Sequence, residues 1–234
     1  MGSEHKRDRE KGTLEISQTH LIGNVVESFG IPKTSPITAS PSLDLRYVSD
    51  EDPVVDASYR EMVGTLMWIA NQTRPDIVNA VRAVARFLHD PKEVHIKAAR
   101  KIIEYVSATA HLGPTFRKDS KLEHMQLEYY LKTHVDADYA HKADDRRSVS
   151  AVAVCCGSTL VSWSFRTQKR VPLSITESEY VAMADVVKEA IYVRVLFLLM
   201  PSTESLSIGV LEDNKGAIDL PKNPLGRRPV STST

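Results

Sequence analysis

Residues 131–156 read LKTHVDADYAHKADDRRSVSAVAVCC, and this stretch decides the fold of the second half of the chain. Side chains alternate with a period of two on either side of a charged turn, which predicts two consecutive β-strands. Asp136 and Asp138 lie two positions apart in the first strand, so both carboxylates project from the same face. Such a pair repels unless a lysine, water or a metal ion separates the charges. Which of the three applies depends on the residues that the fold brings next to the strand.

The composition is that of an ordinary globular protein. The chain has 234 residues, of which 42% are hydrophobic, with 30 Lys and Arg against 30 Asp and Glu. This length suggests one large or two small domains, and we expect two because the hydrophobic period changes along the chain. The balanced charge argues against attraction of the whole surface to nucleic acid but leaves room for a local basic stripe. The charged start and the lack of an apolar run of roughly 18 residues predict a soluble, intracellular protein without a membrane span.

The first half of the sequence predicts mainly helices. A short strand at residues 14–17 leads into a helix that Gly30 ends, and the Pro-, Ser- and Thr-rich residues 31–56 predict an extended, partly disordered linker. Three helices with apolar residues at i, i+3 and i+4 follow within residues 57–112, which predicts a small bundle. Trp68 lies within one of these apolar patterns, and we expect it in the core.

From about residue 130 the hydrophobic period changes from 3.6 to 2. Three strands are expected at residues 131–138, 148–156 and 159–165. A long helix, a fourth strand at residues 207–213 and a further helix follow them. This order predicts an α/β or α+β fold in which a mixed sheet has helices on its faces. Trp163, in the third strand, is also expected in the core.

The long helix has a clear beginning and end. Ser174 and Glu177 have the spacing of a capping box, and Pro201 stops the pattern. We expect the apolar stripe of this helix to be buried; the stripe consists of Tyr180, Ala184, Val187, Ile191, Val195 and Leu199.

Three acidic residues lie where predicted elements begin or end. Asp136 is near the end of the first strand, Glu179 is in the first turns of the long helix, and Asp213 follows the last strand. Ligands of open α/β sheets collect at the carboxyl ends of strands, so these acids can meet around one point. Carboxylates without Cys or His nearby favour Mg²⁺ or Mn²⁺ over zinc. The alternative is that the acids are simply solvated there and, in Glu179, favourable to the helix dipole.

Four segments resemble the C-terminal part of copia-type retrotransposon Pol polyproteins. Residues 136–199 and 211–224 are similar to the family's ribonuclease H domain, residues 8–31 to the end of its reverse transcriptase, and residues 59–106 to its linking helical segment. The segments occur in the family's order and cover roughly nine-tenths of the chain, which makes the resemblance specific.

The resemblance implies a domain organisation. The implied parts are residues 1–30 with a primer-grip-like hairpin and helix, the linker 31–56, the helical connection 57–112, a ribonuclease H-like domain 130–223, and a disordered tail 224–234. The polymerase's own catalytic turn has no counterpart in this sequence, so we expect no nucleotide-adding activity.

The resemblance also implies a chemistry. Asp136, Glu179 and Asp213 match the family's metal-binding carboxylates, with Asp138 close by, and the implied cofactor is Mg²⁺ or Mn²⁺. The reaction is then two-metal hydrolysis of the RNA strand of an RNA/DNA hybrid. The family's last elements, including a fourth carboxylate, have no counterpart after residue 224, so we expect a truncated endonuclease with weak or no hydrolase activity.

Basic residues flank the acidic strands. We expect them to contact the phosphates of the hybrid, although a solvated hairpin rim is an equally good interpretation; they are Arg146, Arg147, Arg166, Lys169 and Arg170. Other Pol chains are further expected partners, and the expected location is the cytoplasm, in virus-like particles, or the nucleus. Two alternatives to the nuclease stay open: a catalytically dead nucleic-acid-binding module, and an inert, poorly folded transposon remnant.

Overall fold

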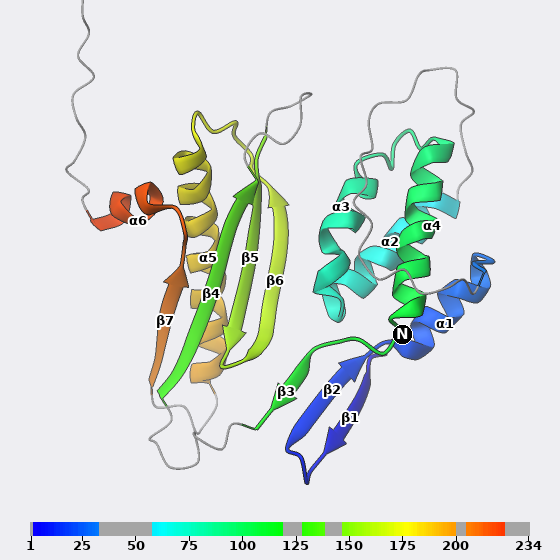
Figure 1. The fold of residues 1–234 in the computed structure, drawn as a ribbon, viewed down its shortest axis with the longest axis horizontal. Coiled ribbons are helices and arrows are strands. Elements are labelled where there is room, and N and C mark those ends of the chain that lie inside the picture. The colour runs from blue at the N-terminus through cyan, green and yellow to red at the C-terminus, as the bar shows by residue number, and fades with distance from the viewer. Residues whose placement is uncertain (1, 33–57, 119–127, 139–146, 200–204, 223–234) are drawn as a thin grey trace, which may run out of the picture. The chain divides into compact units, whose positions relative to one another are not determined.

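The computed structural model describes residues 2–32, 58–118, 128–138, 147–199 and 205–222 (Figure 1). The chain divides into two compact units, Met1–Lys118 (unit 1) and Asp119–Thr234 (unit 2). The expected tail lies outside the described residues, and so does the expected linker apart from Ile31 and Pro32. No helix within the described ranges is both long enough and apolar enough to cross a membrane.

Unit 1 contains a small antiparallel sheet of three strands in the order β1-β2-β3. The strands are β1 Glu4–Asp8, β2 Thr13–Ser17 and β3 Thr115–Arg117. At the turn between β1 and β2, the Asp8 carboxylate accepts backbone N–H bonds from Glu10 and Lys11, and Gly12 has a positive φ of 61°. The sequence pattern predicted only β2. A three-residue strand such as β3 carries no period of its own, and only its pairing with β2 defines it.

The helices of unit 1 pack through the apolar positions that the sequence indicates. They are α1 Thr19–Ser28, α2 Ser58–Gln72, the 3₁₀ turn η1 Pro75–Ile77, α3 Val78–Ala85 and α4 Glu93–Ala108. The expectation for Trp68 is wrong, because this side chain is 44% exposed. Leu66 and Ile69 turn into the core, and Trp68 lies between them in sequence but on the outer face of α2. Trp163 in unit 2 is half-buried.

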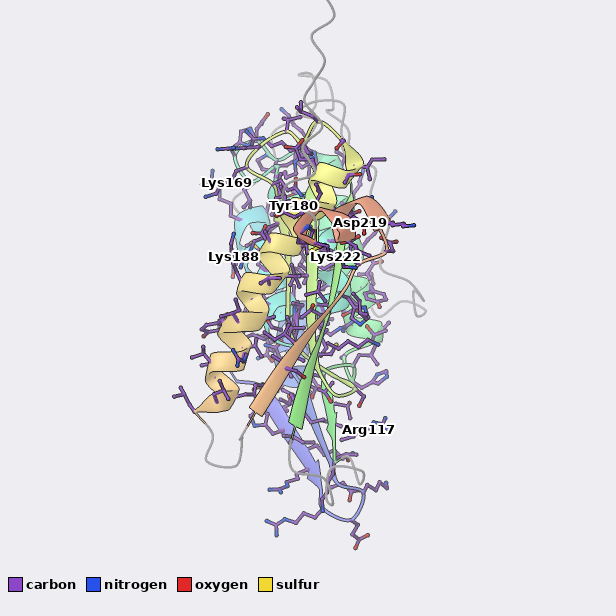
Figure 2. All side chains as sticks on the ribbon, turned by 90° about the vertical axis from the view of Figure 1, so that its left-hand side faces the viewer. Arg117, Lys169, Tyr180, Lys188, Asp219 and Lys222 are labelled. Carbon is purple, nitrogen blue, oxygen red and sulfur yellow. The ribbon has the colours of Figure 1, made fainter. Side chains whose placement is uncertain are left out.

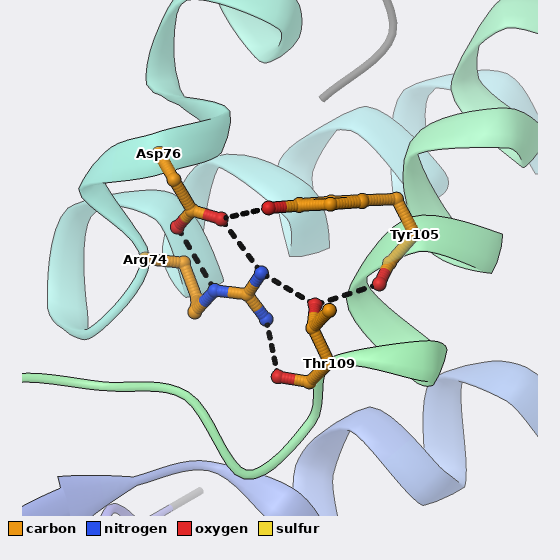
Figure 3. Close-up of polar contacts among 4 residues, drawn as sticks. All are labelled: Arg74, Asp76, Tyr105 and Thr109. Carbon is orange, nitrogen blue, oxygen red and sulfur yellow. Dashed lines mark hydrogen bonds and ion pairs between the residues drawn. The ribbon is translucent and has the colours of Figure 1, made fainter. Parts of the chain in front are cut away.

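A buried arginine fastens the end of α2 to the end of α4 (Figure 3). The Arg74 side chain is 1% exposed, and its Nε and Nη2 donate to the two carboxylate oxygens of Asp76 at 2.9 and 2.7 Å. Its Nη1 and Nη2 also donate to the carbonyl and hydroxyl oxygens of Thr109, the C-terminal cap of α4, at 3.0 and 2.7 Å. The hydroxyl of Tyr105 donates to Asp76 at 2.9 Å. The charge of Arg74 is therefore fully paired, as burial requires.

The ionisation of Asp76 reflects this network. Burial alone would raise the pKa of its carboxyl, but the hydrogen bonds and charge of Arg74 and the hydrogen bond from Tyr105 outweigh it, so that the pKa lies below the ordinary value. The carboxylate is thus held in its charged form by the folded structure of unit 1.

Unit 2 contains a four-stranded mixed sheet in the order β6-β5-β4-β7. Its elements are β4 Glu128–Asp138, β5 Val149–Cys156, β6 Thr159–Thr167, α5 Ile175–Leu198, β7 Ser205–Leu211 and α6 Lys215–Lys222. β4 pairs with β5 and β5 with β6 in antiparallel fashion, whereas β4 and β7 are parallel. The predicted mixed sheet with helices is confirmed, and this is a ribonuclease H-like α+β fold.

Helix α5 covers one face of this sheet, but not with the expected stripe. Its buried apolar positions are Ala182, Val186, Ala190 and Val193. Of these, Ala182, Val186 and Val193 form one hydrophobic core cluster with the sheet residues Leu131, Val152 and Val154. The predicted stripe is largely wrong: Tyr180, Ile191, Val195 and Leu199 are 42, 49, 51 and 76% exposed. Because α5 carries apolar residues on both faces, the period of the sequence does not show which face is buried, and the prediction chose the face with the larger side chains. The small alanines on the other face allow the helix to lie close to the strands.

We predict that Asp76→Asn destabilises unit 1 by about 2 to 3 kcal/mol, because it leaves the charge of Arg74 buried without its carboxylate. Urea denaturation of a Trp163→Phe background, in which Trp68 alone reports on unit 1, measures this. Glu93→Gln is the control, since the exposed Glu93–Lys97 pair should contribute less than about 0.5 kcal/mol. Equal effects of the two changes would contradict the role of the network.

The lowered pKa of Asp76 also predicts a pH dependence. The unfolded chain binds a proton at this carboxyl at higher pH than the folded protein does, so the contribution is complete above about pH 5 and is lost as the pH falls through the folded pKa. We expect the free energy of unfolding of unit 1 to fall more steeply between about pH 5 and 3 in the wild type than in Asp76→Asn. Parallel curves for the two proteins would show that Asp76 titrates normally.

Candidate metal-binding site

One edge of the unit 2 sheet gathers the ends of several elements. β4 and β7 are parallel, so their carboxyl ends lie at the same edge, with Leu211 at the end of β7 paired to His134 of β4. Asp138 at the end of β4 pairs with Val149, the first residue of β5, and Val149 pairs with Thr167, the last residue of β6. Residues that follow β4, β6 and β7 therefore leave the sheet in one region.

Three carboxylates meet at this edge. Oxygen atoms of Glu179, Glu212 and Asp213 all lie within 4.8 Å of one another; Glu179 is buried, Glu212 is half-buried and Asp213 is exposed. The structure thus brings together two of the three acids that the sequence singled out. The backbone of Asp136 pairs with Ala151 in the adjacent strand, but its side chain and that of Asp138 lie outside the described residues. Their convergence with the other acids stays a prediction.

Glu179 is positioned by the capped start of α5. The hydroxyl of Ser174 accepts the backbone N–H of Glu177 at 3.1 Å, as the predicted cap requires. The Glu177 carboxylate accepts the N–H of Leu173 at 2.7 Å, one residue further back than in a standard capping box. Because the first turn is fixed in this way, Glu179 enters the site from a rigid helix and is only 5% exposed.

Asp213 is positioned by the short link between β7 and α6. The side-chain oxygen of Asn214 accepts the N–H of Ala217 at 3.1 Å and thereby caps α6. A Cβ atom on Gly216 would lie 3.1 Å from Cγ2 of Thr176, so α6 approaches the first turn of α5 as closely as a glycine allows. The two neighbouring residues thus have different tasks: Asn214 starts the helix, and Asp213 faces the carboxylates.

Glu212 is a member of the cluster that the sequence analysis missed. Its Oε1 accepts the N–H of Asn214 at 2.9 Å, and its Oε2 is buried without a hydrogen-bond partner in the described part of the chain. Burial raises the pKa of Glu212 above its ordinary value, and the nearby charge of Asp213 adds to this shift, whereas the hydrogen bond from the N–H of Asn214 opposes it only in part. The sequence feature that could have identified Glu212 was its position next to Asp213 at the end of a predicted strand. A glutamate at the end of a strand is usually solvated, however, so this position alone did not indicate a role.

Four of the five basic residues expected to contact nucleic acid are described by the structure, and they lie at the same edge of the sheet as the acids. Arg147 precedes β5, Arg166 is near the end of β6, and Lys169 and Arg170 follow it; all four are exposed. Figure 2 shows Lys169 at the same end of unit 2 as Tyr180, which belongs to the first turns of α5. Arg146 lies outside the described residues.

The donor set of the cluster fits a hard divalent cation. All three side chains offer carboxylate oxygens, which Mg²⁺ and Mn²⁺ prefer. A cation would also offset the burial of the Glu212 charge and its repulsion by Asp213, which together raise the pKa of Glu212. Glu179, Glu212 and Asp213 are therefore the residues that could hold such an ion.

The sequence is similar to those of several known proteins, among them Pol polyproteins of plant retrotransposons. The chain is 30% identical over 233 residues to the Retrovirus-related Pol polyprotein from transposon TNT 1-94 of Nicotiana tabacum, covering 96% of this chain and 17% of that protein. It is 33% identical over 216 residues to the corresponding polyprotein from transposon RE1 of Arabidopsis thaliana, covering 91% and 14%. Secreted RxLR effector protein 161 of Plasmopara viticola is 31% identical over 137 residues, 58% of this chain and 92% of that protein. No protein-family model matches the sequence.

The mixed sheet and the helices of unit 2 form a domain with a ribonuclease H-like fold. The chain belongs to the family of copia-type retrotransposon Pol polyproteins, as its resemblance to that family indicated. It spans only 14 to 17% of the length of the two Pol polyproteins described above.

We predict that Glu212→Gln stabilises unit 2 in the absence of divalent ions. The variant removes the charge that burial and Asp213 disfavour, while its amide oxygen can still accept the N–H of Asn214. Because the folded pKa is raised, the gain should be small near pH 4 and grow as the pH rises, to about 0.5 to 1 kcal/mol with solvent screening. Thermal denaturation at pH 4 and pH 8 measures it.

The exposed Asp219 of α6 provides the control for this change, because its substitution by Asn removes the same charge away from the cluster. If the gain in Glu212→Gln is independent of pH, or if Asp219→Asn reproduces it, the charge of Glu212 within the cluster is not its cause.

Proposed function

We propose that unit 2 is a nuclease domain of the ribonuclease H type, which hydrolyses the RNA strand of RNA/DNA hybrids with the help of Mg²⁺ or Mn²⁺. The observation that carries this proposal is the grouping of Glu179, Glu212 and Asp213 within 4.8 Å at the edge of a mixed sheet. Membership of the Pol polyprotein family supports it. Residues 136–199 and 211–224, which include these acids, resemble the ribonuclease H domain of that family.

In this proposal each acid has a defined task. Glu179 provides a rigid, buried ligand from α5, and Asp213 provides a solvent-facing ligand from the end of β7. Asp136, two residues before the end of β4, would add a third ligand. Bound divalent ions supply the activation of water and the stabilisation of phosphate charge that the hydrolysis needs. Glu212 offers a further carboxylate oxygen to the same group and so favours cation binding.

The basic residues at the same edge would hold the substrate. Arg166, Lys169 and Arg170 are exposed near the end of β6, and they would contact phosphates of the bound hybrid. In this proposal the carboxylates at the edge bind the cations, and the basic side chains at the same edge bind the phosphate backbone of the nucleic acid. Other Pol chains are proposed as further partners, with function in the cytoplasm or nucleus.

The test is cleavage of a hybrid whose RNA strand carries the label, in Mg²⁺ and in Mn²⁺, with a DNA duplex as a second substrate. We expect RNA-strand cleavage only in the hybrid, and a loss of at least about 100-fold in Glu179→Gln, because one carboxylate ligand is removed while the shape is kept. Asp136→Asn should lose activity to a similar extent.

Asp219→Asn is the matched control, since it removes an exposed carboxylate of α6 and should cleave like the wild type. Cleavage that is equal in the wild type, Glu179→Gln and Asp136→Asn would arise from a contaminant and reject the proposal. Salt-dependent binding of the hybrid without any cleavage would instead favour a nucleic-acid-binding module that is catalytically inactive.

A further inference from the structure

A buried glutamine follows the last residue of β6. Gln168 is 5% exposed, although glutamine is usually a surface residue. Its backbone N–H donates to the carbonyl oxygen of Ser148 at 2.8 Å, which fixes it beside the start of β5. The side chain therefore extends from a defined point into the space between the sheet and α5.

The amide nitrogen of Gln168 joins two elements. Nε2 donates to the hydroxyl of Ser150 in β5 at 3.1 Å and to the carbonyl oxygen of Ser178 in α5 at 2.9 Å, and it lies 3.4 Å from the Ser178 hydroxyl. A carbonyl oxygen can only accept, so the nitrogen end of the amide must face α5. Ser150 and Ser178 are 1% and 0% exposed, so water cannot easily replace these bonds.

Both serines are neighbours of predicted ion ligands. Ser178 directly precedes Glu179 in the first turns of α5. Ser150 pairs across the sheet with Ala137, the residue that follows Asp136 in β4. One side chain thus connects the helical turn that carries Glu179 to the strand beside Asp136.

We propose that Gln168 is a positioning residue of the carboxylate site: its amide fixes the first turn of α5, and with it Glu179, relative to the strands that lead to Asp136. The role in ion binding rests on the proposed function of unit 2, whereas the positioning rests on the hydrogen bonds. Small displacements matter at such a site, because Mg²⁺ requires near-octahedral geometry with ligands at about 2.1 Å.

The experiment uses the full chain and compares Gln168→Met with Ser162→Ala. Methionine keeps the length of the side chain but donates no hydrogen bond. The control removes another bond between β6 and α5, from Ser162 to Glu189 at 2.6 Å, ten residues further along the helix than Glu179. Both changes lower stability, so a loss of stability alone does not distinguish them. The distinguishing measurement is the Mn²⁺ dissociation constant from electron paramagnetic resonance.

We expect Gln168→Met to weaken Mn²⁺ binding at least about tenfold and Ser162→Ala to leave it within about twofold of the wild type. If Gln168→Met fails to fold, Ser150→Ala replaces it, because this variant removes only one of the acceptors and should weaken binding to a smaller extent. Wild-type affinity in the glutamine variant, or equal weakening in the control, overturns the inference and leaves the proposed function in place.

Hydrogen exchange separates the inference from the proposed function. If the wild type neither binds Mn²⁺ nor cleaves hybrids, the nuclease proposal fails. The positioning role is then decided by the backbone amides of residues 178–182, which should exchange faster in Gln168→Met and not in Ser162→Ala. Unchanged exchange at these amides overturns the inference as well.

Discussion

The parallel pairing of β4 with β7 is the constraint on which unit 2 depends. These strands are far apart in the chain, and α5 forms the crossover between β5–β6 and β7. Parallel pairing places the carboxyl ends of both strands at one edge, so Asp213 must follow β7 in the region where β4 ends. The close approach of α6 to Thr176 brings the first turn of α5 to the same place. An antiparallel β7 would send its acidic end to the opposite edge.

The sequence predicted the elements that repeat a simple period. The strands of unit 2, α5 and the helices of unit 1 all follow a period of 2 or 3.6 over many residues, and the structure confirms the mixed sheet that their order indicates. The meeting of Glu179 with Asp213 follows from the same order, because both residues lie next to element ends. The short β3 escaped prediction because pairing defines it.

Features that depend on three-dimensional neighbours were missed. The buried face of α5 was assigned incorrectly because alanines and valines face the sheet, whereas larger apolar side chains such as Tyr180 and Ile191 are exposed, so hydrophobicity alone does not identify the inner face. The pairing of Arg74 with Thr109 joins residues 35 positions apart and has no signature in a local pattern. Glu212 could be recognised only once its Oε2 was found buried beside Asp213.

A cluster of carboxylates opposes folding unless other interactions hold its members in place. Each acid at the edge is carried by an element with its own fixed end: Ser174 caps α5, Asn214 caps α6, and Gln168 connects α5 to β5. These contacts are made by neutral side chains, so they position the acids without neutralising them. Under the proposed function, holding these acids together weakens the ion-free protein slightly and favours the binding of a divalent cation.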